Sequence, residues 1–127
     1  FIQRAQARVR ATSIWCDSAE TTLIKGIRTA VYSRRIPVEV RNARKGEIID
    51  RIRLCDMLMS QGRFFILRRC KHTISALSEA VWDSKSPTKD KRLDDGSTNI
   101  DSLDALEYAL ESHANQLIQL GGLYGNK

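Results

Sequence analysis

Apolar side chains along this chain of 127 residues recur with two periods, one typical of strands and one of helices. Short β-prone runs at residues 12–16 and 36–40 predict two strands. Because proline lacks an amide proton, Pro37 indicates either the first residues of the second strand or a strand at the edge of the sheet. A near-continuous apolar run at residues 64–67 predicts a third strand, covered on both faces. Apolar positions three and four residues apart predict helices over residues 20–30, 47–60, 71–82 and 99–118.

The remaining segments predict a helix end, a loop and a tail. Residues 1–10 have the spacing of a helix that begins upstream. Residues 83–98 contain Pro87, Gly96, four Lys or Arg and four Asp, a composition that predicts a mobile loop. Residues 119–127 predict a frayed tail.

The alternation of strands and helices predicts one α/β domain over residues 1–127, with helices on both faces of a mostly parallel sheet. Three strands are fewer than the roughly five or six that such a sheet usually has. The first residue is not Met. We therefore expect the chain to be cut from a longer protein, with the early strands upstream of Phe1.

Composition and charge narrow the class of protein. Hydrophobic residues make up 42% and charged residues 28% of the chain, which is ordinary for a folded domain and excludes a disordered one. No apolar run approaches the roughly 18 residues of a spanning helix, so we expect no membrane partner. Three widely spaced cysteines without a C-x-x-C pair predict reduced core thiols rather than a zinc site.

The net charge of +6 is unevenly distributed. Residues 95–127 carry five Asp or Glu against one Lys, a local charge of −4, so the first 94 residues carry +10. A basic body with an acidic patch suits a protein that holds a polyanion and performs metal chemistry on it. A solvated basic surface is the alternative.

Three aspartates are candidate metal ligands. Asp17 follows the first predicted strand, at the edge of an α/β sheet where ligand sites collect. Asp101 and Asp104 lie one turn apart on the last predicted helix, and Asp104 is at the edge of its apolar stripe, where a carboxylate needs a partner. Converging carboxylates without His or Cys favour Mg²⁺ or Mn²⁺, and two such ions can activate water and stabilise a leaving oxygen. The alternatives are an N-cap for Asp17 and, for Asp101, a cap or a carboxylate in the first turn of its helix.

Basic residues offer candidate phosphate contacts in two places. Four arginines surround the second predicted strand, namely Arg34, Arg35, Arg41 and Arg44. A second group follows the third predicted strand and comprises Arg68, Arg69 and Lys71. For both groups the alternative is a solvated face.

Three segments carry a resemblance to a known family, namely residues 14–20 (Ile-Trp-Cys-Asp-Ser-Ala-Glu), 45–52 (Lys-Gly-Glu-Ile-Ile-Asp-Arg-Ile) and 101–108 (Asp-Ser-Leu-Asp-Ala-Leu-Glu-Tyr). Their order and approximate spacing resemble those in the large subunit of tailed-phage terminases. Over nearly all of residues 10–112 the chain resembles the C-terminal nuclease domain of that subunit. The resemblance implies a ribonuclease H-like layered fold, present here in part.

The resemblance also implies roles for particular residues. Asp17 and Asp104 would be ligands of a two-metal Mg²⁺ or Mn²⁺ site. Asp101 stands where many members have histidine, and it could coordinate or position a metal. Lys45 matches a basic position and would face DNA, with a plain helix-entry lysine as the alternative. A further essential aspartate and the ATPase motor domain would lie upstream of Phe1.

The function that the resemblance implies is a metal-dependent endonuclease that cuts concatemeric viral DNA during packaging, in the cytoplasm of a bacterial host. The activity is expected of the intact domain. Expected partners are double-stranded DNA, the ATPase domain of the same parent chain, the small terminase subunit and the portal. The alternatives are a resolvase-like nuclease of the same fold and a non-catalytic DNA-binding or assembly module.

Overall fold

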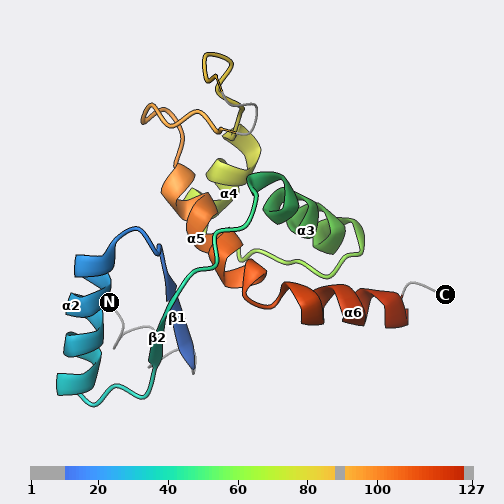
Figure 1. Cartoon of the computed structure of the whole chain (residues 1–127). Coiled ribbons are helices and arrows are strands. Elements are labelled where there is room, and N and C mark those ends of the chain that lie inside the picture. The colour runs from blue at the N-terminus through green and yellow to red at the C-terminus, as the bar shows by residue number, and fades with distance from the viewer. Residues whose placement is uncertain (1–10, 88–90, 125–127) are drawn as a thin grey trace. The chain divides into compact units, whose positions relative to one another are not determined.

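The computed structural model describes residues 11–87 and 91–124, which form two strands and five helices (Figure 1). In chain order these are β1 (Ser13–Cys16), α2 (Thr21–Ser33), β2 (Glu39–Asn42), α3 (Ile48–Ser60), α4 (Lys71–Glu79), α5 (Ile100–Glu111) and α6 (Ala114–Tyr124). They fall into two compact units, an N-terminal unit up to Lys45 and a C-terminal unit from Gly46. The protein is α/β, as predicted, and the helix expected over residues 1–10 lies outside the described residues. The single domain over residues 1–127 stays a prediction.

The N-terminal unit is a strand–helix–strand motif. β1 and β2 pair in parallel, with Ser13 opposite Glu39 at one end and Cys16 opposite Asn42 at the other. α2 connects the strands and packs on β2, as a crossover helix between parallel strands must. Its core consists of the buried side chains of Ile24, Val31 and Val40, with partly buried neighbours at Cys16, Ile27, Ile36 and Val38.

The end of α2 explains why β2 starts later than predicted. Arg35 N donates to Tyr32 O at 3.0 Å and Ile36 N to Val31 O at 3.1 Å, the two bonds of a Schellman cap. The N–H group of Ile36 is engaged in this cap, and Pro37 has no N–H group to donate to the sheet. The first ladder bond therefore runs from Glu39 N to Thr12 O, at 3.0 Å. The predicted strand at 36–40 is wrong in position, and the observed strand covers Glu39–Asn42.

The C-terminal unit is built on α5, against which α3 and α4 both pack (Figure 1). The buried apolar side chains come from all three helices and include Leu54, Leu58, Ala76, Ile100 and Leu103. The helices predicted over 47–60 and 71–82 are confirmed, although α4 ends at Glu79 because Ala80 is extended. α3 ends in a second Schellman cap, in which Gly62 takes the left-handed position with φ 63°.

The predicted helix at 99–118 is broken in two. Ser112 Oγ donates to Tyr108 O at 2.8 Å, and His113 N bonds back to Leu110 O at 2.9 Å. Such back-bonding competes with the helical ladder and bends helices. α6 continues to Tyr124, beyond the expected start of the tail. None of the helices within the described ranges is long and apolar enough to cross a membrane.

The strand predicted at residues 64–67 is wrong. The backbone there belongs to no sheet, and Phe65 is 86% and Leu67 61% exposed. No strand of the described C-terminal unit lies beside it to form a ladder. In the predicted loop at 83–98, the residues that the structure describes form no helix, and Arg92 pairs with Trp82 in a single antiparallel bridge. The mobility of that loop stays a prediction.

Candidate functional site

Asp17 lies directly after β1, at the carboxyl end of the parallel sheet. Its Oδ1 accepts a hydrogen bond from Ala19 N at 2.9 Å and lies 2.5 Å from Lys45 Nζ, while the side chain remains 39% exposed. The N-cap alternative for Asp17 is wrong, because Glu20 occupies the N-cap of α2 and makes no side-chain cap. The carboxylate is therefore placed by a local turn and a salt bridge, facing partly into solvent.

Asp104 lies in the C-terminal unit, on α5, and is 34% exposed. Its Oδ1 is 3.5 Å from Arg51 Nη1 and 3.3 Å from Arg92 Nη1. The expectation that this half-buried carboxylate needs a partner is confirmed, and the structure supplies two arginines.

Glu107, one turn further along α5, completes a buried ionic cluster of four side chains: Arg51, Arg92, Asp104 and Glu107. Glu107 is 2% exposed and receives both guanidinium nitrogens of Arg92, with Nη1 at 3.0 Å from Oε2 and Nη2 close to Oε1. Arg51 Nη1 is 3.3 Å from Glu107 Oε2, and its guanidinium lies over the Tyr108 ring at 5.2 Å. The charges of the two arginines and the two carboxylates cancel, so the cluster has no net charge. It connects α3, the segment after residue 91 and α5.

Besides Asp104, the sequence held a signal for Arg51. Arg51 is three residues after Ile48 and four before Cys55, so a charged side chain stands on the apolar face of α3. A cation there requires a buried anion. Arg92 lies in a polar segment with no periodicity, and no such signal marks it.

Asp101 is exposed in the first turn of α5. Asn99 caps the helix, since its Oδ1 accepts from Ser102 N at 3.2 Å. A carboxylate in a first turn is stabilised by the helix dipole, which is the alternative that the spacing left open.

The donor chemistry of the three aspartates fits Mg²⁺ or Mn²⁺, which prefer carboxylate oxygen. In the described part of the chain, however, no three Asp, Glu, His or Cys side chains gather as a metal group. The oxygens a metal would use on Asp17 and Asp104 face lysine and arginine nitrogens. Asp17 belongs to one unit and Asp104 to the other, and the shared metal site stays a prediction.

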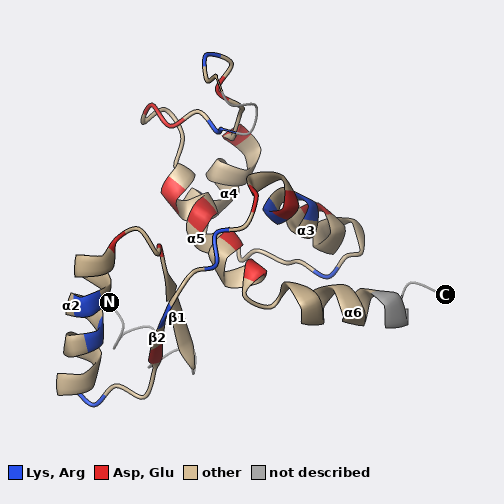
Figure 2. Ribbon diagram, in the orientation of Figure 1, with Lys and Arg blue, Asp and Glu red and all other residues tan. Residues whose placement is uncertain are grey.

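The five predicted DNA contacts all lie exposed in the N-terminal unit; they are Arg34, Arg35, Arg41, Arg44 and Lys45. Figure 2 shows Lys and Arg along α2, at its end and in the segment after β2. The Arg41 guanidinium already has two contacts within the protein, because it pairs with Glu39 at 2.6 Å and lies over the Trp15 ring at 5.3 Å. The hydrogen bond from Arg41 lowers the pKa of Glu39 and raises that of Arg41.

Two of these cations have an unusual backbone conformation. Arg35 has φ 50° and Lys45 has φ 55°, and they are the non-glycine residues with positive φ in the part of the chain that the structure describes. This region costs an L-residue about 1–2 kcal/mol, and glycine occupies it freely. Strained residues of this kind are concentrated at functional sites.

An open pocket of about 530 Å³ lies on the N-terminal unit beside Arg35. Arg28, Tyr32 and Arg35 form part of its lining. Arg28 is fixed across it, donating to Val40 O at 3.2 Å and to Asn42 Oδ1 at 2.9 Å. Sequence reasoning missed Tyr32, which is 88% exposed, although its position just before Arg34 and Arg35 was a signal. The pocket therefore combines an aromatic ring with guanidinium groups.

The three cysteines are free thiols in different environments. Cys55 is buried, and burial, with a smaller contribution from the negative charge of Glu107, raises its pKa to about 11. Burial also raises the pKa of Cys16. Cys70 is exposed, so the prediction of core thiols is wrong for this residue.

Comparison of the chain with models of protein families, with curated proteins and with solved structures found no match.

Proposed function

We propose that this chain is the C-terminal part of a terminase large-subunit nuclease domain, a metal-dependent endonuclease of ribonuclease H-like fold acting on viral DNA. The observation that carries the proposal is the position of Asp17. It directly follows the first strand of a parallel strand–helix–strand unit, which is where α/β folds collect ligands, and it forms a salt bridge with Lys45. The three ordered sequence segments add the resemblance to this nuclease.

The basic surface of the N-terminal unit supports DNA as the substrate. Residues 11–45 carry seven Lys or Arg against three Asp or Glu. Arg35 and Lys45 keep charged side chains at positions where glycine would be more stable. Retention of cations at strained positions is explained if they contact phosphate.

In this proposal Asp17 and Asp104 each contribute carboxylate oxygen to Mg²⁺ or Mn²⁺, and Asp101 assists. The metals would activate water and stabilise the leaving oxygen of the phosphodiester. Lys45 would have to release Asp17, and Arg51 and Arg92 would have to release Asp104. Because Lys45 is exposed and also suits phosphate, DNA binding could draw it away from Asp17, whereas the buried Arg51 and Arg92 would keep their contacts with Glu107.

One observation favours a second candidate, a non-catalytic DNA-binding or assembly module. Two of the three candidate metal ligands are engaged by cations, Asp17 by Lys45 and Asp104 by two arginines. In such a module these aspartates serve structure alone, while the basic surface still binds DNA. A resolvase-like nuclease, the third alternative, would differ by preferring branched over linear duplex substrates.

The proposal is tested by DNA cleavage in the parent protein that contains this chain. Plasmid nicking and linearisation are followed with Mg²⁺ or Mn²⁺, for the wild type, Asp17→Asn and the control Asp50→Asn. Asp50 is a matched control because it is also an aspartate in a salt bridge, here with Arg53 at 3.2 Å, and is 67% exposed.

We expect Asp17→Asn to abolish cleavage while duplex binding persists, and Asp50→Asn to cut as the wild type does. Cleavage by Asp17→Asn at the wild-type rate would refute the nuclease assignment for this site. Duplex binding without cleavage in any of the three proteins would favour the second candidate.

A further inference from the structure

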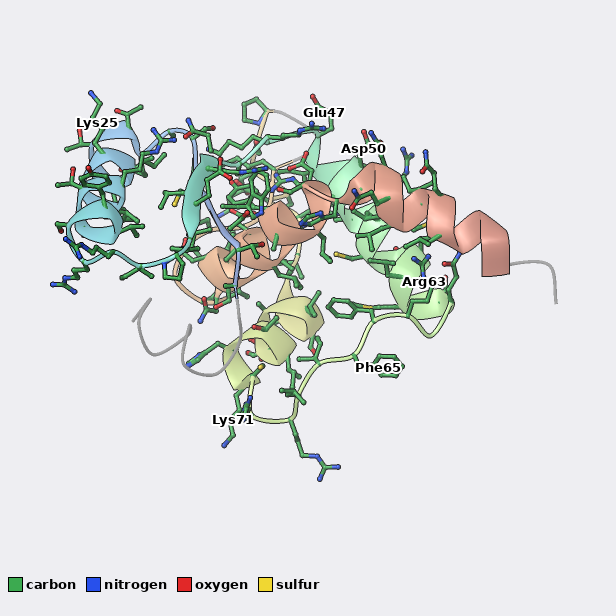
Figure 3. The ribbon with its side chains drawn as sticks, turned by 90° about the horizontal axis from the view of Figure 1, so that it is seen from below. Lys25, Glu47, Asp50, Arg63, Phe65 and Lys71 are labelled. Atoms are coloured by element: carbon green, nitrogen blue, oxygen red, sulfur yellow. The ribbon has the colours of Figure 1, made fainter. Side chains whose placement is uncertain are left out.

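The connection between α3 and α4 exposes aromatic and basic side chains together. Phe65 is 86% exposed and Leu67 61% exposed. Figure 3 shows the Phe65 ring projecting away from the helices, with Arg63 and Lys71 near the two ends of the connection. A single exposed apolar side chain is common, but here an aromatic ring, a second apolar side chain and basic side chains are exposed within one short segment, which favours an interaction surface.

The backbone explains why these two side chains point outwards. Along residues 64–67 exposure alternates, with Phe64 and Ile66 partly buried and Phe65 and Leu67 exposed. This is the two-residue period of extended chain. The inner pair anchors the segment, so the outer pair is held out by the backbone.

The charges beside Phe65 are all of one sign. Residues 57–78 contain four Lys or Arg and no Asp or Glu. Cys70 N donates to Leu67 O at 2.8 Å, which closes a turn with Arg68 and Arg69 at its two central positions. Both arginines are exposed, as is Lys71, which opens α4.

Three of the four cations are available to a ligand. Arg63 is used by the fold, since it donates to Gln61 Oε1 at 2.8 Å and to Leu117 O at 2.9 Å. Among residues 11–87 and 91–124, no carboxylate forms an ion pair with Arg68, Arg69 or Lys71.

We propose that this α3–α4 surface, made of Phe65, Leu67, Arg68, Arg69 and Lys71, binds unpaired nucleic acid. One base stacks on the Phe65 ring, and the three cations contact the neighbouring phosphates. The absence of acids across residues 57–78 favours a polyanion. The aromatic ring favours a polyanion with free base faces, because every base can stack on it whereas the bases of an intact duplex are stacked already.

This inference rests on the proposed function only in taking the ligand of the chain to be a nucleic acid. It adds that the chain holds a separated strand, through residues remote in sequence from Asp17. It is tested by binding without divalent metal, so a failure of the nuclease proposal in the cleavage assay would leave this test intact.

The experiment measures fluorescence anisotropy of labelled probes with the full chain at several salt concentrations. The probes are mixed-sequence DNA and RNA single strands of about 20 nucleotides, long enough for a site of this kind, and the matching DNA duplex. The variants are Phe65→Ala, Phe65→Leu, Phe65→Trp and the triple variant Arg68→Ala, Arg69→Ala, Lys71→Ala. Leu23→Ala is the control, because Leu23 is also a large apolar side chain with 60% exposure.

We expect Phe65→Ala to weaken single-strand binding by about 5- to 150-fold, the range for loss of one base–aromatic stack. Phe65→Leu should behave like Phe65→Ala, because it keeps apolar surface without a ring, and Phe65→Trp should retain affinity. The triple variant should reduce the slope of log K against log salt by about 2. Duplex binding should change less than single-strand binding, and the comparison of DNA with RNA decides which strand is preferred.

Several results would overturn the inference. Wild-type affinity for the single strands in Phe65→Ala, or no single-strand binding by the wild type, would each do so. Wild-type affinity in Phe65→Leu would indicate an apolar protein contact instead of stacking. Binding to poly-glutamate or to phosphatidylserine vesicles that Phe65→Ala weakens, with single-strand binding unchanged, would assign the surface to an acidic peptide or a membrane.

Discussion

Replacing Arg35 by glycine should make the N-terminal unit more stable and a poorer ligand for DNA. Arg35 holds the left-handed position of the cap that ends α2, with φ 50°. That conformation costs an L-residue about 1–2 kcal/mol, whereas glycine adopts it without strain. Glycine also gives the unfolded chain greater conformational freedom, which lowers the free energy of unfolding by about 0.5–1 kcal/mol. Arg35→Gly should therefore raise the free energy of unfolding by about 0.5–1 kcal/mol.

Two control variants separate backbone strain from loss of charge. Arg34→Gly removes the same charge one residue earlier, at φ −91°, and should lower stability by about 0.5–1 kcal/mol. Gly62→Ala makes the reverse change at the equivalent position of α3, where φ is 63° and a Cβ would meet no atom within 4 Å. It should lower stability by about 0.5–1 kcal/mol, the strain of the left-handed conformation less the smaller freedom of the unfolded chain.

The assay for these variants is urea unfolding followed by circular dichroism, with duplex affinity measured by anisotropy. If Arg35 contacts a phosphate, Arg35→Gly should reduce the salt dependence of log K by about 0.9. A fall in stability for Arg35→Gly, equal to that of Arg34→Gly, would refute the strain argument. Unchanged affinity and salt dependence would refute the phosphate contact.

Four further predictions concern the C-terminal unit. Glu107→Gln should lower the free energy of unfolding by about 3–5 kcal/mol, because Arg92 and Arg51 stay buried without their main anion. The control Asp50→Asn should change it by less than about 0.5 kcal/mol. A loss below about 1 kcal/mol for Glu107→Gln in urea unfolding would contradict the role given to the buried ionic cluster. In the same assay, Asp104→Asn should lower the free energy of unfolding by only about 1 kcal/mol, since the Asp104 side chain is partly exposed and Glu107 remains. A loss as large as that of Glu107→Gln would show that Asp104 is the principal anion of the cluster. Near pH 8, Cys70 should react first with a thiol reagent and Cys55 last, because the Cys55 thiol, with a pKa of about 11, is almost wholly protonated there. Equal reaction rates of the two cysteines in the folded protein would contradict the burial of Cys55. In denaturant we expect equal rates. The same raised pKa makes the contribution of Cys55 to stability full below about pH 9 and lost as pH rises towards 11.

Local patterns predicted much of the fold, because β1, α2, α3 and α4 each satisfy their own periodicity. The start of β2 required knowledge of the cap that ends α2 and uses the amide of Ile36. The strand at 64–67 failed because an apolar run does not say whether a partner strand exists beside it. The break at Ser112 depended on one hydroxyl returning to its own helix, which periodicity does not encode.

The candidate site was less predictable than the fold. The sequence showed that Asp104 needs a partner, but the partners come from α3 and from a polar segment with no pattern of its own. Lys45 appeared as a cation near DNA, and the structure adds that it holds Asp17. Charge balance between residues distant in sequence cannot be read from spacing, because the fold decides which cation reaches which carboxylate.

The shared metal site is the central claim, and a crystal structure of the intact parent domain soaked with Mn²⁺ tests it most directly. We predict anomalous density about 2 Å from carboxylate oxygens of both Asp17 and Asp104, with Lys45 no longer on Asp17. The contradicting result is a soaked crystal in which Asp17 remains on Lys45, Asp104 remains on Arg51 and Arg92, and no Mn²⁺ lies at either carboxylate.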